Sequence, residues 1–256
     1  LPYEVSLRSI GIVVAAFLLV LVFALEGNVV LAKWVGLLRP APARLLALVE
    51  QAAQRVGTRP QGVYLLRMQA ANAIAFPVSR RIAVTETALA ELGDEELTAI
   101  CAHELGHLNE PGRVKLARVL GQFVWMPLFA FPLVLKVGGF FGFLATVALC
   151  WVARRMIQRL QRRMETRADG VGHAHEGDPG TYAKALEKLY QIDLMPAVMY
   201  QKRLAHPHLY DRLVEAGVPP TVPRPATPSR WRGLLAILVL MGTASAVWLA
   251  WWIPIA

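Results

Sequence analysis

The stretch "AICAHELGHLNE", residues 99–110, carries two histidines four residues apart and a glutamate directly after the first histidine. On a helix, residues four apart lie on one face, about 6 Å from each other. His103 and His107 can therefore offer imidazole nitrogens to one Zn²⁺ ion, while Glu104 points about 100° away and flanks the ion. Glu104 could take a proton from a metal-bound water. This HExxH arrangement within a helix is a strong signal for a catalytic metal site.

The alternative is a pair of surface histidines without a ligand. The apolar residues around the motif argue against it, because they predict a buried helix, and they are Ala99, Ile100, Ala102, Leu105 and Leu108. Burying two histidines and a glutamate without a shared partner is costly. A metal ion supplies that partner.

A catalytic zinc site needs a third protein ligand and one open position. The segment "RRMETRADG", residues 162–170, offers Glu165 and Asp169 one helical turn apart. Glu165 is the candidate ligand, and Asp169 is the candidate acceptor for a histidine N–H. By themselves, two acids in a basic helix are typical of surface salt bridges. Their position after HExxH and a hydrophobic hairpin favours the metal site.

The composition predicts a membrane protein. The chain is 55% hydrophobic and 18% charged, whereas soluble domains have about 25% charged residues. Apolar stretches cover residues 10–25, 119–153 and 234–253, and the middle one is long enough for a hairpin of two helices. Pro127 and Pro132 imply kinks in that hairpin. We therefore expect about four transmembrane helices; buried core helices, or a hairpin that dips into or lies on the membrane, are the alternatives.

The distribution of basic residues predicts the topology. Residues 26–118 hold 11 of the 27 Lys and Arg residues, and residues 154–233 hold 14. Basic loops stay in the cytoplasm, so we expect both polar segments to face the cytoplasm and to fold together. The +9 net charge is explained by this bias, and no basic–aromatic pattern indicates nucleic-acid binding.

The coarse pattern predicts a mainly α protein with a small β-sheet. Helices are expected at residues 42–57, 93–108, 154–172, 179–192 and 206–217, and strands at 62–68, 72–77 and 80–85. The expected division is an N-terminal transmembrane helix (1–30), a first catalytic part with the HExxH helix (31–118), a transmembrane hairpin (119–153), a second catalytic part with the ExxxD helix (154–217), a Pro-rich linker (218–230) and a C-terminal transmembrane helix (231–256). The sequence begins at Leu1, so we expect its natural start to be missing or removed.

Four motifs in order resemble the membrane-bound zinc metallopeptidases of the HtpX and CAAX prenyl protease family. They are "NAIAFP", the HExxH helix, "ETRAD" after a hydrophobic hairpin, and "HPHLYDR". The similarity spans residues 42–217. Three departures affect topology and subfamily: Ile74 replaces the usual Phe, bacterial members often begin with two spans where one is found here, and a C-terminal fourth span is not general in the family.

The resemblance implies an α+β zincin-type domain whose edge strand holds an extended substrate peptide. It implies one Zn²⁺ ion held by His103, His107 and Glu165, with Glu104 as general base. It also implies that Asn72 helps to hold the substrate backbone or the site. His206 would stabilise the tetrahedral oxyanion, and Arg212 would pair with Asp169.

These features predict a zinc endopeptidase in a bacterial inner membrane, with its catalytic domain facing the cytoplasm, a polypeptide substrate, a lipid bilayer as partner and no nucleic acid. A sensor metalloprotease of the BlaR type is an alternative, although only a short tail follows Ile253 where a sensor domain would be expected. A zinc-stabilised scaffold or chaperone is another, but it would not need Glu104. His173, His175 and Glu176 could bind metal, yet we expect a solvated loop there. The substrate and the oligomeric state cannot be read from the sequence.

Overall fold

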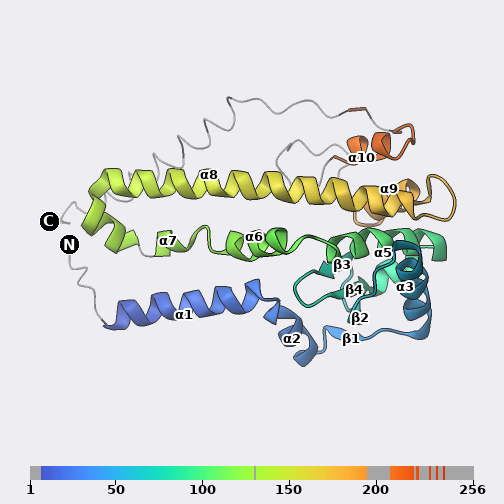
Figure 1. The fold of residues 1–256 in the computed structure, drawn as a ribbon, viewed down its shortest axis with the longest axis horizontal. Helices are drawn as coiled ribbons and strands as arrows, with labels where there is room; N and C mark the ends of the chain where they lie inside the picture. Colours follow the sequence, from blue (N-terminus) through green and yellow to red (C-terminus); the bar gives the residue numbers. More distant parts are fainter. Residues whose placement is uncertain are drawn as a thin grey trace.

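The computed structural model describes residues 7–129, 131–194, 208–221 and 223–224, together with the single residues 231, 235 and 239. Figure 1 shows helices around a small sheet at one end and a longer helical part that extends from it toward the other end. The helices of the described residues are α1 (Leu7–Ala24), α2 (Gly27–Trp34), α3 (Ala43–Val56), α4 (Glu86–Glu91), α5 (Asp94–Leu108), α6 (Gly112–Gln122), α7 (Met126–Phe129), α8 (Phe131–Ala174), α9 (Thr181–Ile192) and α10 (Leu209–Glu215). The expected mainly α fold with a small sheet is confirmed.

The sheet is mixed and has the strand order β1-β2-β4-β3. Its strands are β1 (Leu38–Pro40), β2 (Gly62–Leu66), β3 (Ala73–Phe76) and β4 (Arg81–Thr85). Strands β2 and β4 run parallel, while β1 and β3 pair antiparallel with them. The three predicted strands are confirmed, and β1 was not predicted. Within the described sheet β3 is an edge strand, so one row of its backbone groups is free of strand partners.

Helix α5 begins and ends where its sequence signals predict. Its first turn contains three acidic residues, Asp94, Glu95 and Glu96, which suit the positive end of the helix dipole. The Gly93 N–H donates to Glu96 Oε2 at 2.8 Å and caps the helix. The helix therefore starts at a fixed point and carries HExxH in its last two turns.

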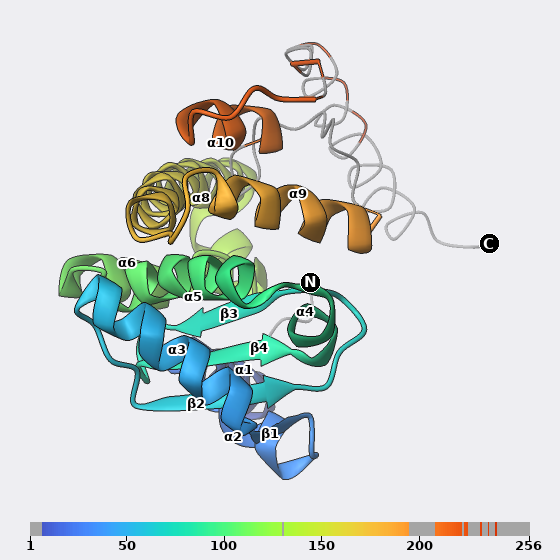
Figure 2. The ribbon, with the colours of Figure 1, turned by 90° about the vertical axis from the view of Figure 1, so that its right-hand side faces the viewer.

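Helix α5 is the centre of the packing. It lies between the sheet and the α8–α9 pair (Figure 2) and contacts α3, α8, α9 and β3. A Cβ atom added to Gly106 would lie 3.3 Å from Ala168 Cα and 3.2 Å from Val171 Cβ of α8. Since glycine has no Cβ, Gly106 lets α8 approach α5 at the level of the HExxH motif.

The sheet buries both of its faces against helices. Ile82 and Val84 of β4 join a core with residues of α3, α5 and α9. Ala83, between them, points the other way and packs with Val29 of α2 and Leu38 of β1. The strand is thus fixed from both sides, and the neighbouring edge strand β3 is fixed with it.

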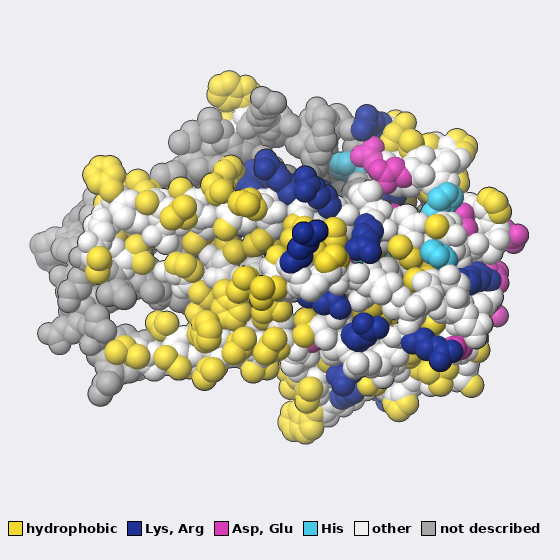
Figure 3. Space-filling model, in the orientation of Figure 1, with side chains coloured by type: hydrophobic (Ala, Val, Ile, Leu, Met, Phe, Trp, Pro, Cys, Tyr) yellow, Lys and Arg dark blue, Asp and Glu magenta, His cyan; other side chains and the backbone are white. Residues whose placement is uncertain are grey.

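The other half of the molecule is apolar and exposed. Figure 3 shows hydrophobic side chains over the region of α1 and the first part of α8, with Lys and Arg side chains near the junction with the end that holds the sheet. Among the described residues, the Val137–Ala174 part of α8 is the one helix long and apolar enough to cross a membrane, and only 6% of its apolar window is buried. Helices α1 and α2 pass the same test only as a pair bent by 82°.

The structure differs from the four-span expectation. The first arm of the predicted hairpin is not one helix: α6 ends at Gln122, α7 covers Met126–Phe129 and α8 starts at Phe131. Pro127 and Pro132 lie at these breaks, since proline cannot continue the hydrogen-bond ladder of a helix. The second arm is helical, and its backbone turns at Gly139 (φ 60°), where the hairpin tip was expected. The predicted C-terminal span, 234–253, lies almost wholly outside the described residues.

Candidate metal centre

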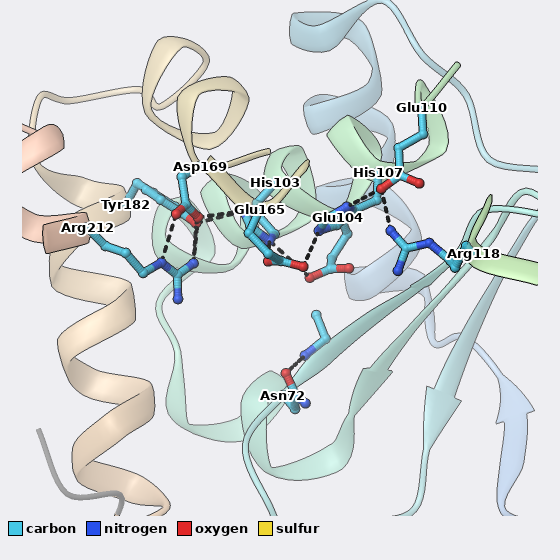
Figure 4. Close-up of polar contacts among 11 residues, drawn as sticks. Asn72, His103, Glu104, His107, Glu110, Arg118, Glu165, Asp169, Tyr182 and Arg212 are labelled. Carbon is cyan, nitrogen blue, oxygen red and sulfur yellow. Dashed lines mark hydrogen bonds and ion pairs between the residues drawn. The ribbon is translucent and has the colours of Figure 1, made fainter. Parts of the chain in front are cut away.

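Three predicted ligands converge at one point (Figure 4). His103 and His107 come from the last two turns of α5, and Glu165 comes from α8. One ligand atom from each residue lies within 4.8 Å of the other two, and this is the one such group of His, Cys, Asp and Glu found in the described part of the chain. His103 Nε2 is 3.8 Å from Glu165 Oε2, and His107 Nε2 is 3.6 Å from Glu165 Oε1.

These residues fit a metal ion. Ligand atoms at about 2.0–2.2 Å from a tetrahedral ion lie about 3.3–3.6 Å apart, close to the observed separations. His103, His107 and Glu165 are 4%, 6% and 6% exposed. Three buried polar side chains that face each other need a shared partner, and two imidazoles with a carboxylate form a typical ligand set for zinc.

A polar network orients His103 from behind. His103 Nδ1 is 3.1 Å from Asp169 Oδ1 and 2.8 Å from the hydroxyl of Tyr182. Arg212 donates to both carboxylate oxygens of Asp169, from Nε at 3.0 Å and from NH2 at 2.6 Å. With Nδ1 occupied by acceptors, Nε2 is the nitrogen left to bind a metal.

Tyr182 is the residue that completes this network, and it was not predicted. Its hydroxyl donates to Asp169 Oδ1 at 2.7 Å and accepts from Arg212 NH2 at 2.9 Å. The ring packs on α8 because Gly172 has no Cβ; an added Cβ would lie 2.9 Å from the ring. Burial, opposed in part by Arg212, raises the pKa of Tyr182, so the hydroxyl keeps its proton. In the sequence, Tyr182 is one apolar position of an amphipathic helix, so no signal marked it.

Glu104 lies beside the three candidate ligands and is not one of them. Its Oε1 is 3.9 Å from His103 Nε2. Burial raises the pKa of the Glu104 carboxyl above its usual value. The nearby His103 and His107 and a hydrogen bond from the backbone of Ala75 offset part of this rise in pKa. A carboxylate whose pKa is moved toward neutral is suited to accept and return a proton.

The pocket at the ligands is walled by the edge strand. Its lining includes Asn72, Ile74 and Pro77 on the sheet side, and Leu186 and Arg212 on the other. Asn72 Oδ1 accepts from the Ala73 N–H at 2.9 Å, so this side chain caps the start of β3 and lies apart from the ligands (Figure 4). The backbone of Asn72 pairs with Thr85, which leaves residues 73 and 75 facing away from β4.

Sequence reasoning also missed two residues beside His107. Glu110 accepts from His107 Nδ1 at 3.0 Å, and Arg118 is bound to the same oxygen of Glu110. The predicted helix ends at residue 108, and no role was predicted for Glu110. A carboxylate three residues after a candidate ligand is the signal that could have identified Glu110.

Two further predictions meet different outcomes. His206 lies outside the described residues. Glu176 is not a solvated loop residue: its side chain is 5% exposed and accepts from the N–H groups of Gly180 and Tyr182, so it fixes the first turn of α9. His173 Nδ1 contacts it at 2.9 Å. The expectation of a solvated segment was wrong for Glu176 because this carboxylate caps the helix that carries Tyr182.

Comparison with known proteins agrees with the site. The model of peptidase family M48 matches residues 41–217, which include HExxH, Glu165 and Arg212. The chain belongs to peptidase family M48. This is a family of metallopeptidases, which agrees with a possible metal site at His103, His107 and Glu165.

Similar proteins carry the name HtpX. The protease HtpX homolog of Trichormus variabilis is 31% identical over 163 residues, which cover 57% of this chain and 56% of that protein. The homolog of Thermoplasma volcanium is 34% identical over 117 residues, 42% of this chain and 38% of that protein. Protease HtpX of Legionella pneumophila is 28% identical over 161 residues, 57% of this chain and 58% of that protein. The matched part of this chain thus spans about half the length of these relatives.

Proposed function

We propose that this M48 chain is a membrane-anchored zinc endopeptidase that hydrolyses peptide bonds of membrane or misfolded proteins. The observation that carries the proposal is the convergence of His103, His107 and Glu165, with Glu104 beside them and not among them. A structural zinc site is closed by four protein ligands, whereas a catalytic site has three and an open position. The described residues offer three.

The side chains divide the chemistry between them. His103, His107 and Glu165 would hold Zn²⁺, which when bound acts as a Lewis acid and lowers the pKa of a coordinated water toward about 7. Glu104 accepts the proton of the attacking water and returns it to the leaving amine. Its burial excludes competing solvent and keeps the carboxylate at a fixed place beside the ligands.

The edge strand β3 is suited to hold the substrate. The N–H groups of Ala73 and Ala75 already bond to Asn72 and Glu104, so the carbonyl oxygens of these two residues are the groups that an extended peptide beside the edge can bind. Asn72 occupies the Ala73 N–H and so fixes the end of this edge. The peptide would lie in the pocket beside β3, with its scissile carbonyl toward Glu104. His206 is proposed as an oxyanion donor from its motif.

We further propose that residues 31–118 and 154–217 form one catalytic domain on the cytoplasmic side of a bacterial inner membrane. The support is the change along α8, where an exposed apolar stretch gives way to a basic one. Where the apolar part of α8 meets its basic part, Arg155 stacks on Trp151, and its guanidinium carbon lies 4.6 Å from the ring centroid. Paired aromatic and basic residues are typical of a membrane–water interface. The spans beyond α8 remain part of this proposal.

The test is Glu104→Gln in the full chain, purified in detergent, with cleavage of a labelled unfolded protein and zinc content measured together. We expect cleavage to fall about 10²–10⁴-fold, the range for losing a general base, with zinc retained. Glu95→Gln is the matched control, because Glu95 lies on the same helix and its partners, Arg55 at 3.0 Å and Gln51 at 3.2 Å, are not candidate ligands. Wild-type cleavage by Glu104→Gln would contradict the proposal.

A further inference from the structure

The second ligating histidine, His107, has a support of its own. Its Nδ1 lies 3.0 Å from Glu110 Oε1, and its Nε2 faces Glu165. Glu110 is not in the ligand group, because it contacts the ring nitrogen on the far side of the metal position. The Nδ1–H of His107 can therefore donate to Glu110, which leaves the lone pair of Nε2 for the metal.

The chain path after α5 places this carboxylate. Helix α5 ends at Leu108, and the Glu110 N–H donates back to the His107 carbonyl at 3.2 Å. This tight turn places the Glu110 side chain next to the imidazole of His107, three residues earlier in the sequence. The side chain is 2% exposed, so it is not a surface group that meets His107 by chance.

Arg118 compensates the buried charge of Glu110. It comes from α6, and its NH2 group lies 2.5 Å from the same Oε1 atom that accepts from His107. Glu110 Oε2 and Arg118 Nε are both buried and have no hydrogen-bond partner among the described residues. Both atoms belong to this one pair, so a small rotation to a bidentate geometry would satisfy both.

The arrangement repeats the one behind His103. There, Asp169 contacts Nδ1 and Arg212 holds Asp169; here, Glu110 contacts Nδ1 and Arg118 holds Glu110 (Figure 4). The two pairs come from different elements, and they reach the two histidines from opposite sides. If the Glu110–Arg118 salt bridge only joined the turn after α5 to α6, Glu110 Oε1 would not also need to contact the imidazole of His107.

We infer that Glu110 is a positioning residue for the metal ligand His107, and that Arg118 holds Glu110 in place. The inference rests on the proposed metal centre. Glu110 fixes the tautomer and the ring plane of His107 and increases its donor strength. Loss of such a partner typically lowers metal affinity or activity about 10–100-fold.

The test measures metal binding first and activity second. The variants are Glu110→Ala, Glu110→Gln, Arg118→Met and Arg118→Lys, in the full chain in detergent. Zinc dissociation constants come from competition with a chelator, ligand geometry comes from the visible absorption of the Co²⁺-substituted protein, and folding is followed by circular dichroism. Glu95→Gln is again the control, because it removes a carboxylate–arginine contact of α5 that touches no ligand.

We expect Glu110→Ala to raise the zinc dissociation constant about 10–100-fold and to change the Co²⁺ spectrum. Glu110→Gln keeps an acceptor oxygen but loses the charge, so its effect should be smaller and in the same direction. Arg118→Lys should lie closer to wild type than Arg118→Met. In cleavage assays of the zinc-saturated variants, kcat should fall while KM is unchanged. Glu95→Gln should match wild type in all measurements.

Wild-type zinc affinity and an unchanged Co²⁺ spectrum in folded Glu110→Ala would overturn the inference. If Glu110→Ala does not fold, the near-isosteric Glu110→Gln decides, and wild-type values for it would overturn the inference as well. A wild-type protein that binds no zinc would instead overturn the proposed function, and this inference with it. The two failures are therefore distinguishable.

Discussion

The two histidines of the metal centre are supported by the same chemistry from very different parts of the chain. His103 is held by Tyr182, 79 residues later, and by Asp169, which Arg212 holds from a further 43 residues away. His107 is held by Glu110, only three residues later. The first support exists only when α5, α8, α9 and α10 have packed together. The second is built into the turn that follows α5.

The two supports also differ in their contact with water. Arg212 and Arg118 both line the pocket, but the side chain of Arg212 is 7% exposed and that of Arg118 is 29% exposed. A fully buried charge depends on its partner, while a partly exposed one can be hydrated. The support of His103 is therefore a feature of the folded core. The support of His107 is partly open to water at Arg118.

The largest expected difference between the two supports is in stability. Arg212→Met leaves the buried carboxylate of Asp169 without its cation, and breaking a buried pair in this way costs about 3–5 kcal/mol of unfolding free energy. Arg118→Met should cost less, because the Arg118 side chain is 29% exposed and water can take its place beside the Glu110 carboxylate. Denaturant unfolding of both variants in the same detergent measures this. Equal losses would show that the two pairs are equally buried in solution.

Metal affinity should respond next. Asp169→Asn removes the charge behind His103 and should weaken zinc binding about 10–100-fold, the range for partners of ligating histidines. Chelator competition measures it, with Asp94→Asn as control, since Asp94 pairs with Arg44 in the exposed first turn of α5. An unchanged dissociation constant for Asp169→Asn would mean that His103 needs no support from α8.

Among these variants, Tyr182→Phe should change unfolding free energy and zinc affinity the least. The variant removes the hydroxyl but leaves the Asp169–Arg212 pair and the contact of Asp169 with His103. One hydrogen-bonding group is worth about 0.5–1.5 kcal/mol, so a shift of this size in unfolding free energy and a smaller change in zinc affinity than for Asp169→Asn are expected. A loss of zinc as large as that of Asp169→Asn would make Tyr182 the principal support of His103.

The sequence predicted those parts of the site that depend on short spacing. The two histidines, Glu104 and the pair Glu165 and Asp169 each occupy one or two helical turns, so helix geometry alone places them relative to each other. Tyr182 and Arg118 are brought in by packing between elements, and nothing in their own neighbourhood marks them. Glu110 could have been found, because its spacing from His107 is local.

The elements of the catalytic part follow the same rule. Helices α3 and α5 were predicted because their caps and periodicity are local, and Gly57 ends α3 with a left-handed φ of 72°. Strand β1 has three residues and ends in Pro40, so it has no pattern of its own and exists because β2 pairs with it. The bend of 82° between α1 and α2 was not expected either, because hydropathy shows how apolar a stretch is but not where its helix axis changes direction.

The zinc content of Glu165→Ala is the most direct test of the metal centre, because Glu165 is the ligand that comes from a different helix. Wild type and variant are purified under the same conditions and analysed for zinc per chain. We predict one zinc ion in wild type, as a three-ligand catalytic site requires, and a large loss in Glu165→Ala, with Glu104→Gln retaining the metal. Full zinc in Glu165→Ala would contradict a site made of His103, His107 and Glu165.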